Sequence, residues 1–138
     1  MAENITLEVV TPEKYVVSEE AQIVASPGMF GEFGVLRGHT PFMTALKVGP
    51  VRYTDAGGTE HCVFVSGGFA EALPDKVTIL AESAERRREI DLERALAAKQ
   101  RAEKRLAEER AREEIDFLRA RLALERAIIR IRLAETRK

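Results

Sequence analysis

The order of apolar and polar residues divides the chain into two parts with different periods. Near the N-terminus Ile5, Leu7 and Val9 alternate with polar residues, a period of two that is typical of a half-buried β-strand. Further short apolar runs follow at roughly even spacing, at 15–17, 21–25, 42–48, 51–54, 59–65, 69–73 and 77–81. Such a series of about eight to ten strands is typical of an antiparallel sandwich or barrel, and we predict an antiparallel β-sandwich over residues 1–83.

Glycine and proline mark the predicted turns of this first part. All nine glycines and all five prolines lie at or before Pro74. The sequence Asp-Ala-Gly-Gly at 55–58 is typical of a hairpin turn. Four of the glycines fall within residues 28–38, where a phosphate-binding loop is the functional alternative. No Lys-Ser/Thr pair and no predicted helix follows, so we interpret the segment as a tightly folded turn.

Residues 84–138 contain neither glycine nor proline, and nearly all of them favour helix. We predict a first helix from Glu89 or Asp91 to about Arg110, with Asp91 as its N-cap or a first-turn residue. A second helix is predicted from Ile115 to about Glu135, packed on the first as an antiparallel hairpin. The acid-rich segment at 108–114 separates them without a helix breaker. The same sequence could therefore straighten into one rod on the order of 60–70 Å long.

Apolar spacing supports the hairpin. On the first helix the apolar residues are Leu92, Ala95, Leu96, Ala98, Ala102 and Leu106. The second helix has two apolar stripes, one of Ile115, Leu118, Leu122, Ile129 and Leu133 and the other of Phe117, Ala120, Leu124, Ile128 and Ile131. A helix with two apolar faces has to bury both. We expect one to pack on the first helix and the other on the β domain or on another protein.

Composition narrows the function. The net charge is −1, which favours neither nucleic acid nor an anionic membrane as a partner. Up to Ala81 there are five basic and ten acidic residues, whereas from Glu82 onward there are seventeen basic and thirteen acidic. These opposite signs suggest different partners for the two parts.

The residues that could carry catalysis or bind a metal are few. Neither histidine, His39 or His61, has metal ligands or a nucleophile at a suitable spacing, and the single cysteine, Cys62, lies in a strand-like run. We expect a docking domain, no catalytic residues and no metal site. No apolar run reaches the length of a membrane span.

Several arginines of the helical part lack a carboxylate at the helical neighbour positions. Three on each helix share one face at spacing i, i+7 and i+11, namely Arg94, Arg101 and Arg105 and then Arg119, Arg126 and Arg130. Around Arg101, Arg126 and Arg130 the residues three and four positions away include no acid. Either this is a solvated face, or the two helices form an anion site, for which the planar guanidinium is well suited.

The sequence resembles a known family, the epsilon subunit of the bacterial rotary (F-type) ATP synthase. The resemblance extends over the whole chain. It rests on Gly-Glu-Phe-Gly-Val-Leu at 31–36 with His-Thr-Pro at 39–41, on Ser-Gly-Gly-Phe at 66–69 and on Val-Thr-Ile-Leu-Ala at 77–81. The tail is similar to the ATP-binding, Bacillus-type version, whose signature Ile-Asp-x-x-Arg-Ala is matched at 90–95.

The resemblance implies a non-catalytic subunit of a proton-transporting enzyme complex, peripheral on the cytoplasmic side of the cell membrane. It implies that the β domain contacts the gamma subunit and the c-subunit ring, and that the extended tail reaches the alpha and beta subunits and blocks ATP hydrolysis. The basic tail fits an acidic loop of beta, because seven basic and two acidic residues follow Phe117. It also implies ATP as a regulatory ligand, and leaves a magnesium requirement open. The implied ATP-binding residues are Glu85, Ile90, Asp91, Arg94, Ala95, Arg101, Arg126 and Arg130.

Two other classes compete with this interpretation. A scaffolding or nucleic-acid adaptor would use the basic helical arm to bind a polyanion, and its binding would fall steeply with salt. The nearly balanced charge of the tail and its few aromatic residues argue against it. A small enzyme would need a catalytic constellation that the sequence lacks. Membrane contact, in the favoured reading, comes only through the complex.

Overall fold

The computed structural model describes residues 3–108 and 114–136 and divides the chain into two compact units. The first unit ends at Arg86 and the second begins at Arg87. The expected boundary at 83/84 lies three residues earlier, because residues 84–86 form a strand that pairs with the sheet. The first unit is all β and the second is helical, which is the predicted fold class.

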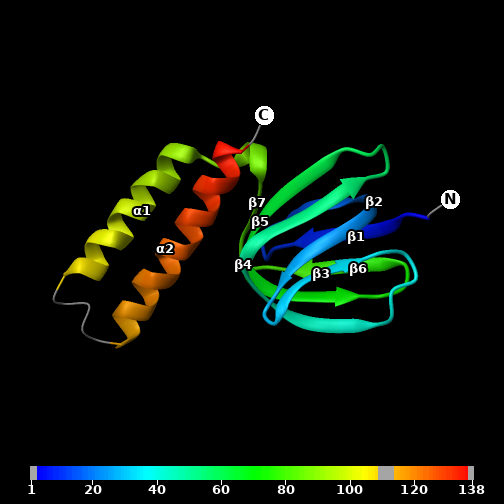
Figure 1. Ribbon diagram of the computed structural model, residues 1–138, viewed down its shortest axis with the longest axis horizontal. Helices are drawn as coiled ribbons and strands as arrows, with labels where there is room; N and C mark the ends of the chain where they lie inside the picture. Colours follow the sequence, from blue (N-terminus) through cyan, green and yellow to red (C-terminus); the bar gives the residue numbers. More distant parts are fainter. Residues whose placement is uncertain (1–2, 109–113, 137–138) are drawn as a thin grey trace. The chain divides into compact units, whose positions relative to one another are not determined.

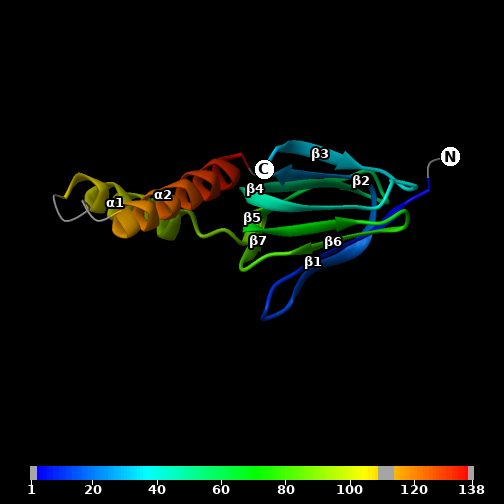
Figure 2. The same cartoon turned by 90° about the horizontal axis from the view of Figure 1, so that it is seen from below.

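The β unit contains seven strands (Figure 1). They are β1 (Ile5–Val10), β2 (Tyr15–Gly28), β3 (Gly31–Val35), β4 (Phe42–Asp55), β5 (Glu60–Ala72), β6 (Lys76–Leu80) and β7 (Ala84–Arg86). Hydrogen bonding gives the order β1-β6-β5-β4-β2-β3, with β7 added to β5. Strand β1 also pairs with β2, so the sheet closes on itself. The strands thus form a sandwich with the character of a barrel, seen edge-on in Figure 2.

Three features of the sheet differ from the prediction. Strand β2 runs without interruption where two strands were expected, and β4 and β5 continue through Gly49-Pro50 and through residues 66–68. The predicted turn near residue 31 contains β3, an edge strand paired with β2. Among the described pairings, β1 and β6 are parallel and the others antiparallel. Gly49-Pro50 stays inside β4 because the pairing with β5 continues on both sides of it, while the register between β4 and β2 shifts nearby.

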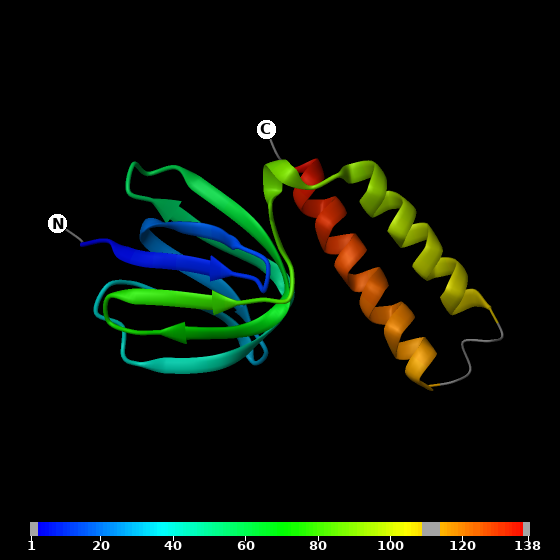
Figure 3. The same ribbon diagram turned by 180° about the vertical axis from the view of Figure 1, so that it is seen from behind.

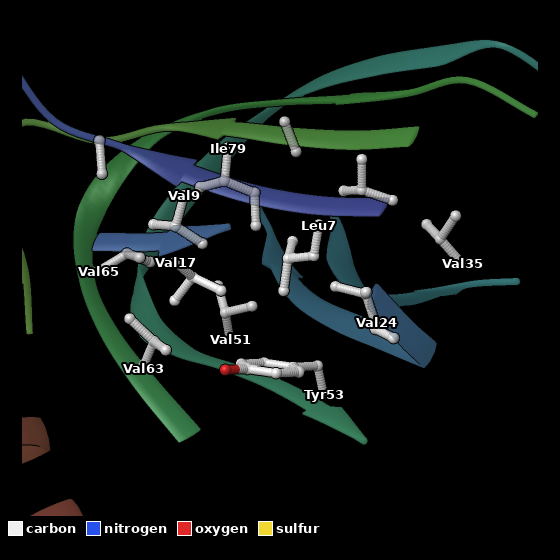
Figure 4. Close-up of a cluster of buried hydrophobic side chains, with 14 of the residues drawn as sticks. Leu7, Val9, Val17, Val24, Val35, Val51, Tyr53, Val63, Val65 and Ile79 are labelled. Carbon is white, nitrogen blue, oxygen red and sulfur yellow. The ribbon is translucent and has the colours of Figure 1, made fainter. Parts of the chain in front are cut away.

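Alternation fills the interior of the β unit with apolar side chains. The predicted residues Ile5, Leu7 and Val9 are fully buried. They share the core with Val17 and Ala21 of β2 and with Val77 and Ile79 of β6. Figure 4 shows side chains from several strands meeting there, with the ring of Tyr53 among them and its hydroxyl at the margin. The whole first unit therefore has its own core, as an independently folding domain requires.

One glycine is required for a close approach between strands. Gly68 on β5 has φ +131°, and a Cβ there would lie 1.9 Å from the carbonyl oxygen of Leu80. No other residue type fits without displacing the β5–β6 ladder. The Ser-Gly-Gly-Phe run is thus a point of backbone contact inside a strand, where the sequence indicated a break between strands.

The helical unit contains a short 3₁₀ helix η1 (Arg87–Glu89), α1 (Leu92–Ala107) and α2 (Glu114–Glu135). The two long helices lie side by side and antiparallel, as the view from behind shows (Figure 3). The hairpin, the Asp91 cap and both starts were predicted closely. The first helix ends at Ala107, three residues before the expected Arg110, because Glu108 is its C-cap and has an extended backbone. Arg110 itself and most of the acid-rich segment lie outside the described residues. No helix among the described residues is long and apolar enough to cross a membrane.

Candidate functional site

The two helices of the hairpin meet along a seam of alanines. The buried alanines are Ala95 and Ala102 on α1 and Ala120, Ala127 and Ala134 on α2. Within each helix they are spaced by seven residues, so they stay on one side. Small side chains at every contact position let the helix backbones approach closely. The position of the alanine seam determines on which side of the hairpin each of the other side chains lies.

The seam corrects one expectation about the second helix. One apolar stripe was expected to pack on the first helix and the other on the β domain or on another protein. Members of both stripes are exposed, however, since Phe117, Leu118 and Leu122 are 45%, 50% and 39% exposed. The reason is that alanines, including Ala127, which belongs to neither stripe, make the helix contact. Burial of the larger residues is confined to the C-terminal half, at Ile131 and Leu133. The side chain of Ile115 lies outside the described ones.

The start of α1 explains why its sequence begins Ile-Asp-x-x-Arg-Ala. Asp91 has extended backbone angles, and its Oδ1 accepts the Arg94 backbone N–H at 3.1 Å. Its carbonyl accepts the Ala95 N–H at 3.0 Å. Ile90 and Ala95 are 2% and 3% exposed. Asp91 therefore serves as the N-cap, while the two apolar residues beside it are buried as the helix enters the seam.

The four predicted arginines lie on one face of the hairpin. Arg94, Arg101 and Arg126 each come directly before a seam alanine. Successive residues of an α-helix are rotated by about 100° around its axis. Seen from one end and followed along the chain, two antiparallel helices turn in opposite senses. The residues directly before a seam alanine therefore lie on the same side of the hairpin in both helices. Arg130, three residues after Ala127, turns about 60° to that side. By the same geometry Arg119, directly before Ala120, and Arg105, three residues after Ala102, lie on that side as well, so the four predicted arginines belong to a longer row of cations.

The surroundings of these arginines differ between the helices. Arg94 and Arg101 are exposed, whereas Arg126 and Arg130 are half-buried. With the residues that the structure describes, Arg94, Arg101 and Arg126 form no ion pair, and the ion pair within α1 is Lys99–Glu103 at 3.7 Å. A row of cations, in which Arg94, Arg101 and Arg126 form no ion pair with a described residue, is suited to a multiply charged anion such as a polyphosphate.

Two further residues extend the picture. Glu85, predicted with the same site, lies in β7 opposite Phe64 and is half-buried, so it belongs to the β unit. Arg87 of η1, which packs against α2, was not predicted. Its Nε is buried and makes no hydrogen bond with any described residue. A buried guanidinium N–H needs an acceptor, so this arginine adds to the anion-binding character of the helical unit.

The β unit contains a polar cluster that sequence reasoning missed. The Tyr53 hydroxyl donates to Glu19, and Arg86 Nη2 donates to the same Glu19 oxygen at 3.4 Å. The ring of His61 stacks on Tyr53 with centroids 4.9 Å apart, and its Nε2 lies 2.7 Å from Asp55 Oδ2. Glu19 and Arg86 are far from Tyr53 in the sequence, so no spacing pattern signals that the cluster contains them.

The environment of the cluster changes two proton affinities. Burial raises the pKa of Tyr53 well above its usual range, and the bond to Glu19 acts in the same direction. The hydroxyl therefore stays protonated and can donate. The hydrogen bond from His61, followed by the backbone N–H of Thr59 at 2.9 Å, lowers the pKa of Asp55.

The outer surface of the sandwich bears many exposed apolar side chains. Phe69 on β5 and Leu80 on β6 are register partners and are 58% and 54% exposed. Other exposed apolar residues of this unit are Tyr15, Ile23, Met29, Phe30, Leu36, Phe42 and Met43. Apolar surface of this extent is typical of a protein-binding domain, in agreement with the docking role expected from sequence.

Comparison with known proteins gives the family. The model of the ATP synthase delta/epsilon chain β-sandwich domain matches residues 4–87, and that of the long α-helix domain of the same chain matches residues 88–135. The ATP synthase epsilon chain of Desulforapulum autotrophicum is 65% identical over 99% of this chain and 100% of its own length. That of Syntrophobacter fumaroxidans is 56% identical over 98% of both.

Solved structures agree. A chain in the cryo-EM structure of the Euglena gracilis mitochondrial ATP synthase, containing OSCP, F1 and the c-ring, has a TM-score of 0.78 and 25% identity, covering 91% of this chain and 78% of that one. A chain of the Tetrahymena thermophila central stalk and c-ring shares the fold, with a TM-score of 0.60, 10% identity and coverage of 96% and 98%.

Proposed function

The chain belongs to the epsilon family of ATP synthase subunits, and on that premise we propose that it acts in the central stalk as a coupling subunit and as a regulator of ATP hydrolysis. The β unit would bind the gamma subunit and the c-ring through its exposed apolar surface. Rotation of the stalk then links proton flow to ATP synthesis. The chain itself is non-catalytic and reaches the cytoplasmic side of the cell membrane through the complex.

The helical unit is the regulatory part of this proposal. Its seam is made of alanines, which bury little apolar area for each residue, so the hairpin is held less firmly than a leucine-packed pair. The exposed apolar residues of α2 and its basic C-terminal half would become available to the gamma, alpha and beta subunits when the hairpin opens. In that form the tail blocks hydrolysis.

ATP is the ligand that we propose for the closed hairpin. The observation that carries this proposal is the row of four arginines along one side of the seam, without ion pairs at Arg94, Arg101 and Arg126 among the described residues. A ligand bound by the hairpin alone stabilises it by RT ln(1 + [L]/Kd), which is about 2.7 kcal/mol at a hundredfold excess over Kd. Falling ATP therefore releases the inhibitory form.

Calorimetric titration of ATP into the isolated full-length chain tests the site. We expect Arg126→Ala and Arg130→Ala each to weaken binding by about tenfold or more, because a charge-assisted bond to phosphate is lost. Arg132→Ala is the matched control, since Arg132 is an exposed arginine two residues beyond Arg130 on the same helix. If Arg126→Ala and Arg130→Ala bind ATP as well as the unchanged chain, the site is wrongly placed.

The subunit role has its own test. The tagged chain, expressed in a host with the other subunits of the complex, should copurify with alpha, beta and gamma. Recovery of nucleic acid in their place would favour the polyanion-binding adaptor.

A further inference from the structure

Arg86 is the last residue of the β unit, and its side chain connects strand β7 to two strands with which β7 does not pair. Its Nε donates to the Val16 carbonyl of β2 at 3.2 Å. Its Nη1 donates to the Tyr53 hydroxyl of β4 at 3.3 Å, and its Nη2 to Glu19 of β2 at 3.4 Å. One guanidinium thus has three acceptors around it.

Strand β7 is a short element at the end of the β unit. Its ladder to β5 consists of three residue pairs at positions 84–86. Before it, Ser83 is held by Ser66, whose hydroxyl accepts the Ser83 N–H at 3.0 Å. After it, the next residue already belongs to the helical unit. A strand of three residues is a weak element, and the Arg86 side chain adds support at the end that leads into the helical unit.

The acceptors of Arg86 are themselves fixed. Tyr53 is 2% exposed, donates its hydroxyl proton to Glu19 and carries His61 stacked on its ring. His61 is in turn held by Asp55. The guanidinium therefore binds a prearranged group of acceptors, and little conformational entropy is lost when the bonds form.

A metal ion is the alternative organiser of this cluster. Glu19, Asp55 and His61 each offer one ligand atom, and the three atoms lie within 4.8 Å of one another. However, the Glu19 oxygen already accepts bonds from Arg86 and Tyr53, and a guanidinium at that distance repels a cation. Asp55 accepts from the backbone and contacts His61. The guanidinium fits these oxygens better than a divalent cation does.

We propose that Arg86 is a positioning residue that fixes β7 to the sandwich and so places the pivot of the helical unit at the Arg86–Arg87 junction. Without it, residues 84–86 would join the connecting segment and lengthen the tether by about 10 Å, at about 3.3 Å per residue. The regulatory consequence rests on the proposed function, in which the helices have to reach a defined place in the complex. The fixation of β7 does not depend on that function.

Hydrogen exchange of the full chain, followed at the amides of residues 84–86, tests the fixation. We expect Arg86→Ala to accelerate their exchange by about tenfold, the effect of one half-exposed charge-assisted bond group. Arg86→Lys keeps the charge but cannot serve three acceptors, so it should restore protection only in part. Glu19→Gln removes the charge of the main acceptor without touching β7 and should also accelerate exchange. Unchanged exchange in Arg86→Ala or Glu19→Gln would overturn the proposal.

The control is Arg52→Ala, which breaks the exposed ion pair with Glu32 on the same sandwich. Arg52→Ala should leave the exchange rates of the amides at 84–86 unchanged. If it accelerates exchange as much as Arg86→Ala does, general loosening of the sheet is responsible and not the position of Arg86. EDTA added to the unchanged chain should have no effect. Faster exchange with EDTA would assign the fixation to a metal ion.

Inhibition of hydrolysis in an epsilon-depleted, reconstituted complex then tests the consequence. Arg86→Ala should shift the concentration for half-inhibition by severalfold, and Arg86→Lys by less. If the unsubstituted chain inhibits and Arg86→Ala has the same concentration for half-inhibition, the proposed pivot at the Arg86–Arg87 junction would be wrong. An unchanged chain that fails to inhibit would speak against the proposed function, while the exchange result at β7 would stand.

Discussion

Enlarging one seam alanine should open the hairpin. Ala127 is 1% exposed in the middle of the helix contact, so Ala127→Leu forces three additional carbon atoms into a space already filled. Overpacking of this kind costs about 1–3 kcal/mol. Because 1.36 kcal/mol is a factor of ten, the ratio of open to closed hairpin should rise about 5- to 150-fold. Where the open form dominates without ligand, the ATP midpoint for closure rises by the same factor.

Energy transfer between dyes on the two helices measures this closure. Exposed positions Glu93 and Arg132 lie near the start of α1 and the end of α2, which are adjacent in the hairpin. In a continuous rod they would be on the order of 60 Å apart, at 1.5 Å per residue. Ala107→Leu, at an exposed alanine, is the matched control. An Ala127→Leu midpoint equal to that of the unchanged chain, or to that of the control, would refute the alanine seam as the closing contact.

Three further substitutions test other parts of the structure. Gly68→Ala should destabilise the β unit by more than about 1 kcal/mol, lowering the Tm by several degrees, because its Cβ meets the Leu80 carbonyl. Gly34→Ala, whose Cβ would make only ordinary van der Waals contacts at 3.9 and 4.0 Å, should change the Tm little, and equal shifts would contradict the geometry. Asp55→Asn should flatten the pH dependence of the free energy of unfolding below about pH 4. The Asp55 carboxylate has a lowered pKa in the folded state, so it stabilises that state above the unfolded pKa of 3.8 and loses this effect as the pH falls through the folded pKa. Denaturant titrations that give the same pH dependence at acid pH for both chains would count against this. Asp91→Ala should cost about 1 kcal/mol of helix stability by circular dichroism and Asp91→Asn much less, so equal losses would argue against the cap.

Local periodicity was sufficient for the main elements. Alternation at Ile5, Leu7 and Val9 identified β1 and its buried face, and the change to helical spacing without glycine or proline identified the hairpin. Asp91 was recognisable as a cap because an acceptor directly precedes a helical pattern. These features depend on neighbours within a few residues, which a sequence displays directly.

Strand length and the polar cluster depended on distant partners. Gly49-Pro50 stays inside β4 because β5 pairs on both sides of it, and no local rule contains that ladder. Arg86 and Glu19 meet across 67 residues. The arginine row could be predicted only in part. The spacing of the arginines within each helix was visible in the sequence, but their position on the same side of the hairpin follows from the antiparallel arrangement and the alanine seam.

Reconstitution of the enzyme complex with two forms of the chain tests the central claim most directly. An epsilon-depleted complex would receive either the full chain or a chain ending at Arg86, and its hydrolysis rate would be measured from low to high ATP. The account predicts that the full chain inhibits at low ATP and progressively less as ATP rises, while the shortened chain binds the complex without inhibiting at any ATP concentration. Equal inhibition by both forms, or inhibition by the full chain that does not depend on ATP, would contradict it.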